Sequence, residues 1–402
     1  MSRMRTSDDF DPRIAAWLEA DPHRAPVAVL EGVLTDFPAM QQRRRSITPA
    51  WSHRQRLAVR GTLAAIVVVA VAATLAALLR PWPGAVGGSG QPLNLPGRSQ
   101  VLLNWQTTDD IAVTISRDPS DQTDYYWRAV AYDVIDTKGW SIGPETQTDQ
   151  AANARVFDQI ADGVSGVGSS AVTISVEPGT FTSPIVLSPG VPMQVDQPVV
   201  LVTGPGNYLS SMSRPGTSRY RVTSLVSRPG NALGEWSVPA LRTAARTDPG
   251  GDLQRYTWVA EGSIGPNARA LEQRIAAAAG STEPIDIVEA TMALLRSNEF
   301  MYDTDVRDLS CDSLSTVECF ATYKRGFCQH YAATMAVLLR DLHIPTRIVE
   351  GFLPGERMGG TEVIRNNNAH AWVEVYFPGF GWVPFDPTGA NDPAQLPAAL
   401  PS

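Results

Sequence analysis

Cysteine is scarce in this sequence. The 402 residues include three cysteines, Cys311, Cys319 and Cys328, which are spaced eight and nine residues apart. The short C-x₂₋₄-C pairs of structural zinc sites are missing, so a zinc centre built from these cysteines and a histidine is disfavoured. Because three is an odd number, at least one thiol stays unpaired. In an oxidising compartment Cys311 and Cys319 could form a short disulfide that leaves Cys328 free, or both could stay reduced.

Positive charge is also in short supply. The chain has 33 basic and 41 acidic residues and a formal net charge of −8 at pH 7. Residues 1–60 hold ten basic and seven acidic residues, a net charge of +3, which leaves −11 for the remainder. This negative surplus disfavours binding to nucleic acid and direct adhesion to anionic lipid. We therefore expect no nucleic-acid partner.

Long apolar runs are absent apart from one. Residues 61–79 are nineteen consecutive uncharged and mostly apolar positions, enough at about 1.5 Å per residue to cross a hydrocarbon core of about 30 Å. Six arginines and no acidic residue lie between positions 41 and 60. The positive-inside rule then places the N-terminus in the cytoplasm and the chain beyond about residue 80 outside it. We expect a single-pass, uncleaved anchor in the cell membrane.

The remaining chain divides by composition. A linker rich in proline and glycine follows the apolar run, and alternating apolar segments between turn residues then predict a β-rich, sandwich-like domain. The predicted strands of that domain are 101–105, 111–117, 125–135, 171–178, 183–187, 197–202 and 220–227. Two helical patterns, beginning at Pro266 and Pro284, open the next domain. The expected segments are 1–60 cytoplasmic, 61–79 transmembrane, 80–98 linker, 99–250 β-rich domain, 251–388 C-terminal domain and 389–402 disordered tail.

Cys328 stands at the start of a helical pattern. Apolar residues spaced four apart between Phe327 and Leu342 predict a buried helix that starts near the cysteine. The unpaired N–H groups and the positive dipole end of such a helix favour the thiolate, which is the reactive form. His330 is two residues further on and about 200° around the helix, so we interpret it as structural. A lone buried cysteine is more often an inert small hydrophobe than a nucleophile, so Cys328 needs partners.

A predicted β-hairpin supplies those partners. The segment 369–377 alternates, with His370, Trp372, Glu374 and Tyr376 on one face, and Pro378-Gly379-Phe380-Gly381 turns the chain back. If residue 376 pairs with residue 380 or 382, Asp386 falls opposite His370 or Trp372 and shares the histidine face. A slip of one residue would send Asp386 to the other face. Each residue alone has an ordinary structural explanation, but the three together predict a nucleophile, a base and an orienting acid.

The two segments that carry these residues resemble a known family. RGFCQHYAATMAVLLRDLHIPTRIVEGFLPGE and NNNAHAWVEVYFPGFGWVPFDPT, within about residues 284–388, are similar to the transglutaminase-like superfamily of papain-type folds, in its bacterial membrane-anchored branch. The resemblance implies an α+β fold in which a helix-borne cysteine packs on an antiparallel sheet. It also implies that Cys328, His370 and Asp386 are the catalytic residues.

The oxyanion site is less well defined by the sequence. Thr322 occupies the position, six residues before Cys328, where papain-like proteases resemble one another in carrying glutamine. The backbone N–H of Cys328 and the side chain of Trp372 are candidates for that role. Gln329 and Tyr376 are further candidates for lining the site.

The resemblance implies thiol acyl transfer on protein or peptide amides at the cell surface, either cross-linking or deamidation of glutamine side chains. This chemistry requires no metal and no organic cofactor. One alternative is a cysteine peptidase or amidase that uses the same three residues. Another is a non-catalytic surface module that binds or assembles envelope components. The sequence does not define the oligomeric state.

Overall fold

The fold is described for the part of the chain that contains the predicted β-rich and C-terminal domains. A computed structural model describes residues 97–156, 160–162, 169–214, 216–229, 235–244 and 250–388, together with residues 93 and 95. The predicted cytoplasmic segment 1–60, the predicted span 61–79, most of the linker 80–98 and the tail 389–402 lie outside these residues. None of the helices in the described part of the chain is both long enough and apolar enough to cross a bilayer.

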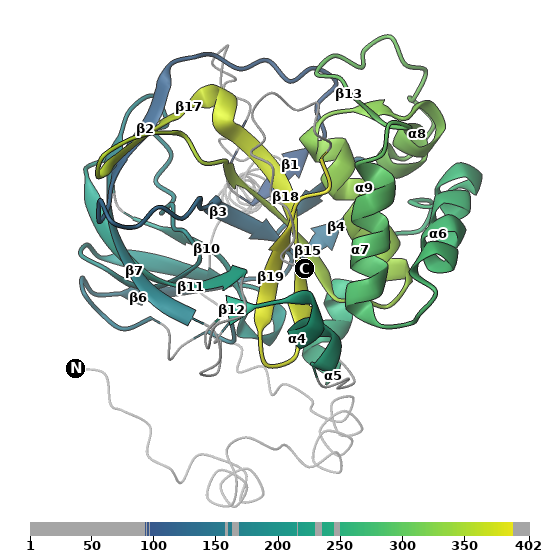
Figure 1. Cartoon of the computed structure of the whole chain (residues 1–402). Helices are drawn as coiled ribbons and strands as arrows, with labels where there is room; N and C mark the ends of the chain where they lie inside the picture. Colours follow the sequence, from purple (N-terminus) through teal and green to yellow (C-terminus); the bar gives the residue numbers. More distant parts are fainter. Residues whose placement is uncertain are drawn as a thin grey trace, which may run out of the picture. The chain divides into compact units, whose positions relative to one another are not determined.

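A four-stranded antiparallel sheet, in the order β19-β18-β15-β3, forms the centre of the described structure (Figure 1). Two of the alternating apolar segments predicted as strands, 125–135 and 369–377, belong to this sheet, and both of its faces are covered. Residues of β15 and β18 are almost all buried. The sheet contains β3 (Trp127–Tyr132), β15 (Thr346–Phe352), β18 (Ala369–Phe377) and β19 (Gly381–Phe385).

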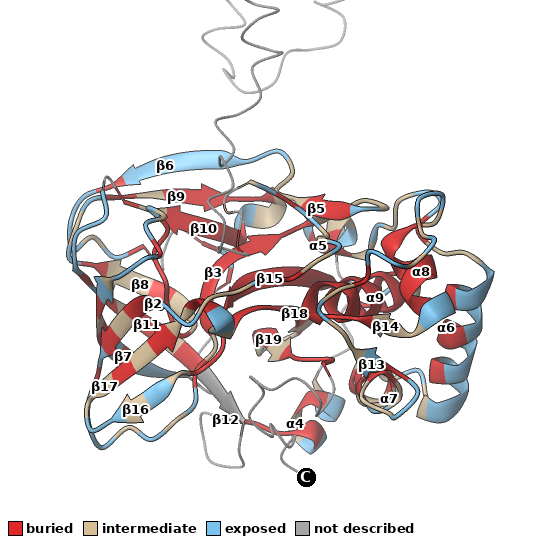
Figure 2. Ribbon diagram, turned by 90° about the horizontal axis from the view of Figure 1, so that it is seen from above, coloured by how far each residue is buried: buried red, intermediate tan, exposed pale blue. Residues whose placement is uncertain are grey.

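Helix α9 (Cys328–Asp341) packs on β15 and β18, and further helices surround it (Figure 1). The two predicted helices are confirmed as α6 and α7: each has proline in its first turn, and α6 ends at Gly280 with φ of 58°. Burial decreases outward from the sheet: α9 is buried from Cys328 to Arg340, whereas α6 carries many exposed residues (Figure 2). The other helices are α4 (Val238–Thr243), α5 (Gly250–Leu253), α6 (Pro266–Ala279), α7 (Pro284–Leu295), α8 (Thr316–Tyr323), η4 (Pro205–Asn207), η5 (Gln254–Thr257) and η6 (Asn366–Asn368).

The segment before residue 250 is rich in β-structure, as predicted. Its strands belong to a seven-stranded sheet that includes β2, β7, β8 and β11, to two three-stranded sheets, and to the central sheet. The remaining strands are β1 (Arg98–Gln100), β2 (Ile111–Ser116), β4 (Val134–Ile135), β5 (Gly139–Ser141), β6 (Thr146–Gln150), β7 (Ser169–Pro178), β8 (Val191–Val195), β9 (Val199–Thr203), β10 (Leu209–Ser213), β11 (Tyr220–Pro229), β12 (Glu235–Trp236), β13 (Met301–Tyr302), β14 (Arg325–Gly326), β16 (Glu356–Met358) and β17 (Thr361–Arg365).

Two predicted strands are wrong. Residues 101–105 form a single bridge at Asn104, and residues 183–187 form one at Ile185. In the first segment the Val101 N–H donates to Lys138, whereas the Trp105 N–H donates to Thr304. Because these backbone groups bond to two separate stretches of chain, no continuous ladder forms.

Sheets cross the predicted boundary at residue 250. Strand β3 pairs with β15, with Phe352 opposite Trp127, and β2 pairs with β17. The division into domains at 250/251 stays a prediction, but the sheets on either side of that position are continuous. The central sheet is therefore complete only with a strand from the β-rich segment.

Buried charges also join the two segments. On the central sheet, Arg347 Nε donates to Glu374 Oε2 at 2.7 Å, and Arg347 Nη2 donates to Asp162 Oδ1 at 2.9 Å. Arg128 of β3 lies 3.5 Å from the Glu374 carboxylate. All four side chains are buried, and buried charges are tolerated in proteins when they are paired in this way.

Candidate active site

Cys328 is the first residue of α9, as the sequence predicted. Phe327 precedes it in extended backbone conformation, and the cysteine is fully buried. Gly326 allows close packing there, since a Cβ at this position would lie 2.7 Å from the His330 Cβ. The thiol is therefore fixed at the positive end of the helix dipole, where negative charge is stabilised.

His370 and Asp386 meet through the register of the hairpin β18–β19. The pairing of Tyr376 with Trp382 and of Val373 with Phe385 is one of the two registers predicted from the sequence, so that prediction is confirmed. Asp386 follows the last residue of β19 and lies on the histidine face. Its Oδ2 lies 2.9 Å from His370 Nε2.

The imidazole of His370 connects the acid to the thiol. Nε2 is engaged by the Asp386 carboxylate, and interactions with the Cys328 side chain are among the causes that raise the pKa of the ring. A carboxylate can only accept, so Nε2 carries the proton and Nδ1 is the nitrogen left for sulfur. The structure thus brings Cys328, His370 and Asp386 together, although their catalytic roles stay predictions.

The pair formed by His370 and Asp386 favours charge on both partners. Burial works to lower the pKa of His370, but the Asp386 carboxylate and the hydrogen bonds with Asp386 and Cys328 raise it well above its usual value. Burial works to raise the pKa of Asp386, but the His370 charge and hydrogen bonds from His370 and Thr388 lower it to about 2. The stabilisation from His370 is therefore complete below about pH 6.5 and is lost as pH rises through its raised pKa.

Further donors hold the Asp386 carboxylate. The Thr388 N–H and hydroxyl donate to Oδ1 at 3.0 and 2.6 Å, and the Tyr126 hydroxyl donates to Oδ2 at 2.9 Å. Arg296 Nε donates to the Asp386 main-chain oxygen at 3.0 Å. Sequence reasoning missed Tyr126, because only the pairing of β3 with β15 brings it to the site from 260 residues away.

The three predicted lining residues have different surroundings. Trp372 is buried and packs edge-on against Tyr126, with ring centroids 5.1 Å apart. Within the described part of the chain, its indole N–H has no hydrogen-bond partner. Gln329 instead accepts from the Leu102 N–H and donates to Glu350. Tyr376 lies six residues along β18 from His370, about 20 Å away, in an aromatic cluster with Tyr208 and Trp382.

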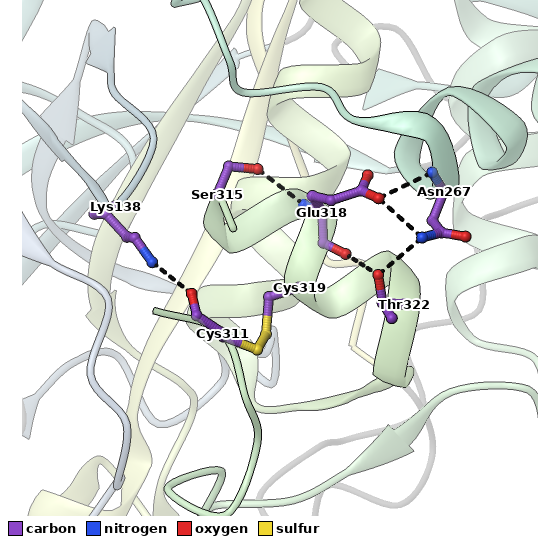
Figure 3. The surroundings of a disulfide bond; sticks show 7 residues. All are labelled: Lys138, Asn267, Cys311, Ser315, Glu318, Cys319 and Thr322. Carbon is purple, nitrogen blue, oxygen red and sulfur yellow. Dashed lines mark hydrogen bonds between the residues drawn. A yellow bond between two sulfur atoms is a disulfide. The ribbon is translucent and has the colours of Figure 1, made fainter. Parts of the chain in front are cut away.

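A disulfide joins Cys311 to Cys319, with Cα atoms 5.5 Å apart, and it leaves Cys328 as the free cysteine (Figure 3). Cys319 belongs to α8, whose Glu318 carboxylate accepts from backbone and side-chain N–H groups of Asn267 at the start of α6. Thr322, also on α8, donates to the Glu318 main-chain oxygen at 2.7 Å. Among the residues the structure describes, no three His, Cys, Asp or Glu side chains gather as a metal site.

His330 has the structural surroundings that the helical pattern predicted. Its ring packs against Phe327, with centroids 4.5 Å apart, and burial lowers its pKa to about 4. At neutral pH it is therefore an uncharged packing residue. His370 is the histidine whose pKa is raised and whose ring interacts with the thiol.

Comparisons with known proteins identify relatives of the C-terminal part of the chain. Residues 269–387 match the transglutaminase-like superfamily. Over 119 residues the chain is 41% identical to the uncharacterized protein YebA of Bacillus subtilis, a match that covers 28% of this chain and 16% of YebA. Over 137 residues it is 34% identical to the protein-glutamine gamma-glutamyltransferase of Pseudomonas aeruginosa, covering 34% of this chain and 20% of that enzyme. The matches thus span a small part of both relatives.

A solved structure shares the fold over a longer stretch. The periplasmic domain of TgpA from Pseudomonas aeruginosa superposes with a TM-score of 0.51 at 21% sequence identity, covering 73% of this chain and 94% of that domain. The superposed region is longer than the 119 residues that match the superfamily. The likeness therefore extends to the β-rich segment as well as to the helices and the central sheet.

Proposed function

Residues 269–387 form a transglutaminase-like core domain, and from that premise we propose that this chain is a cysteine acyltransferase that acts on amide groups of proteins or peptides. The observation that carries the proposal is the position of the His370 imidazole, which is hydrogen-bonded to Asp386 through Nε2 and interacts with Cys328 strongly enough for this to contribute to its raised pKa. In this proposal Cys328 is the nucleophile, His370 carries the proton and Asp386 orients the imidazole.

The first half of the reaction forms a thioester. The thiolate of Cys328 attacks the amide carbonyl carbon, and the C–S bond forms as the carbonyl becomes a tetrahedral oxyanion. His370 Nδ1 then gives its proton to the amide nitrogen, the C–N bond breaks, and ammonia or an amine leaves. The Cys328 N–H at the start of α9 and the unpaired indole N–H of Trp372 are the candidate oxyanion donors.

The second half of the reaction releases the acyl group. A primary amine attacks the thioester, His370 takes the proton that this amine loses, and sulfur leaves as thiolate. Water could take the place of the amine and give hydrolysis. Support for the amine comes from the relative of Pseudomonas aeruginosa, which is named a protein-glutamine gamma-glutamyltransferase.

We further propose a glutamine side chain of a cell-surface protein as the acyl donor. The relative from Pseudomonas aeruginosa is named for transfer of protein glutamine groups. The anchor predicted at residues 61–79 would hold the domain outside the cytoplasm, and the Cys311–Cys319 disulfide fits an oxidising compartment.

Incorporation of a labelled amine tests this function. The full-length chain in detergent, given a glutamine-containing protein and a fluorescent primary amine, should attach the label to glutamine and release one ammonia for each label. The matched control is the same reaction without the amine, in which ammonia release should be much slower. Cleavage of the glutamine-containing protein without label incorporation would instead assign the site to a peptidase.

A further inference from the structure

Tyr126 reaches the proposed site by strand alternation. It immediately precedes β3, and its two neighbours point into the main core: the Tyr125 hydroxyl donates to Asp121 Oδ2 at 2.8 Å, and the Trp127 indole donates to Glu362 Oε1 at 3.0 Å. Successive residues of extended chain point to opposite faces. The side chain of Tyr126 therefore lies on the other face, with its ring 6.5 Å from that of His370.

Backbone pairing determines this position. Strand β15 lies between β3 and β18, with Phe352 opposite Trp127 on one side and Gly351 opposite His370 on the other. Tyr126 thus lies across the sheet from His370 at the same end of the strands. The contact between Tyr126 and Asp386 follows from the register of the central sheet.

The hydroxyl of Tyr126 shares one oxygen atom with His370. Both groups lie 2.9 Å from Asp386 Oδ2, whereas Thr388 occupies Oδ1 with two hydrogen bonds. A hydrogen bond to a carboxylate withdraws negative charge from it and makes it a weaker partner for a neighbouring cation. Tyr126 and the imidazolium therefore share the negative charge of the same oxygen atom.

We propose that Tyr126 is a positioning residue that acts through Asp386, limiting how tightly the carboxylate holds the imidazolium of His370. The consequence for the reaction is kinetic. The imidazolium must give up a proton to the leaving amine, and a carboxylate that held it more tightly would make that step slower. The core domain 269–387 would then depend on a residue of the β-rich segment for full activity. The reaction itself rests on the proposed function, whereas the state of the imidazole can be measured without any substrate.

The charged groups around His370 determine how removal of the Tyr126 hydroxyl would change the imidazole. They are Cys328 from α9, Asp386 after β19 and, through the main-chain oxygen of Asp386, Arg296 at the end of α7. Replacing Tyr126 with phenylalanine keeps the ring against Trp372 and leaves Thr388 and Arg296 holding Asp386. The carboxylate therefore stays in place, and the remaining change is a stronger attraction between Asp386 and the imidazolium.

The test compares Tyr126→Phe with Tyr125→Phe, which removes the same atom one residue away on the opposite face. In the full-length chain, the rate of Cys328 alkylation by iodoacetamide and the rate of amine incorporation are measured from pH 5 to 10. For Tyr126→Phe we expect the basic limb of the amine-incorporation profile to move upward by roughly 0.5 pH unit, and kcat to fall by about 3- to 10-fold with KM unchanged. For Tyr125→Phe we expect neither change.

A second variant keeps the proposal testable if Tyr126→Phe folds poorly. Fluorotyrosine at position 126 is a stronger donor of nearly the same size, so the basic limb should move downward. A uniform loss of rate with no displacement of the pH profile in either variant would reduce Tyr126 to a packing residue and overturn the proposal. If no amine is incorporated but the pH profile of Cys328 alkylation is displaced in Tyr126→Phe and not in Tyr125→Phe, the proposed function fails and the role of Tyr126 stands.

Discussion

Replacement of Cys328 with serine should reduce amine incorporation by about 10⁴-fold or more. Serine occupies nearly the same volume, so the buried start of α9 should be preserved. The imidazole of His370 can pair with a thiolate, but a serine hydroxyl beside the same imidazole stays protonated. A protonated hydroxyl is a much weaker nucleophile at neutral pH. The measurement is the rate of label incorporation under single-turnover conditions.

The control for this prediction is thermal unfolding of the same variant, which should resemble that of the unaltered protein. A melting temperature within a few degrees, combined with loss of the label, assigns the defect to chemistry. Retention of more than a tenth of the wild-type rate would mean that another residue attacks the amide. If Cys328→Ser left every cellular phenotype unchanged, that result would support the alternative that the chain is a non-catalytic binding module.

Replacement of Arg347 with methionine should lower the free energy of unfolding by about 3–5 kcal/mol. The guanidinium stands between Glu374 and Asp162, and its Cζ lies 4.2 Å from the centroid of the Trp382 ring. Methionine would fill much of the volume but remove the positive charge between the buried carboxylates of Glu374 and Asp162, leaving Arg128 at 3.5 Å from Glu374. Urea denaturation of the full-length chain, followed by tryptophan fluorescence, measures the change.

A surface pair provides the matched control. Arg274 and Glu299 also form an ion pair, but their side chains are 47% and 39% exposed. The same substitution, Arg274→Met, should cost at most about 1 kcal/mol because water screens and replaces the interaction. Equal losses for the two variants would show that the buried cluster does not join the β-rich segment to the central sheet.

Local sequence patterns predicted the elements that carry the site. The start of α9 at Cys328, the helices α6 and α7 and the hairpin register of β18 and β19 all follow from spacing over a few residues. In such elements the residues that decide the structure are close in sequence. This is why the face shared by His370 and Asp386 could be predicted without a structure.

Long-range pairing could not be predicted in the same way. Nothing local indicates that β3 joins β15, and therefore nothing indicated that Tyr126 would contact Asp386. Gln329 is predicted from the sequence to line the site. Its surroundings depend instead on Leu102 and Glu350, which lie in other parts of the sequence.

The dependence of Cys328 alkylation on pH tests the central claim most directly. With Cys311 and Cys319 joined, Cys328 is the free thiol among the three cysteines, so labelling by iodoacetamide reports on it alone. An ordinary thiol loses reactivity on the order of 10²-fold between pH 9 and pH 6, as its thiolate is protonated. Comparing rates within one variant removes the effect of an opening step whose equilibrium does not change with pH.

We expect the wild-type chain to lose far less than that 10²-fold, because the imidazolium of His370, held by Asp386, stabilises the thiolate in acid. His370→Gln, which keeps a side chain of similar length without the charge, should show the full decrease of an ordinary thiol. The same pH dependence in both proteins would contradict the account, because sulfur and imidazole would then not act as a pair.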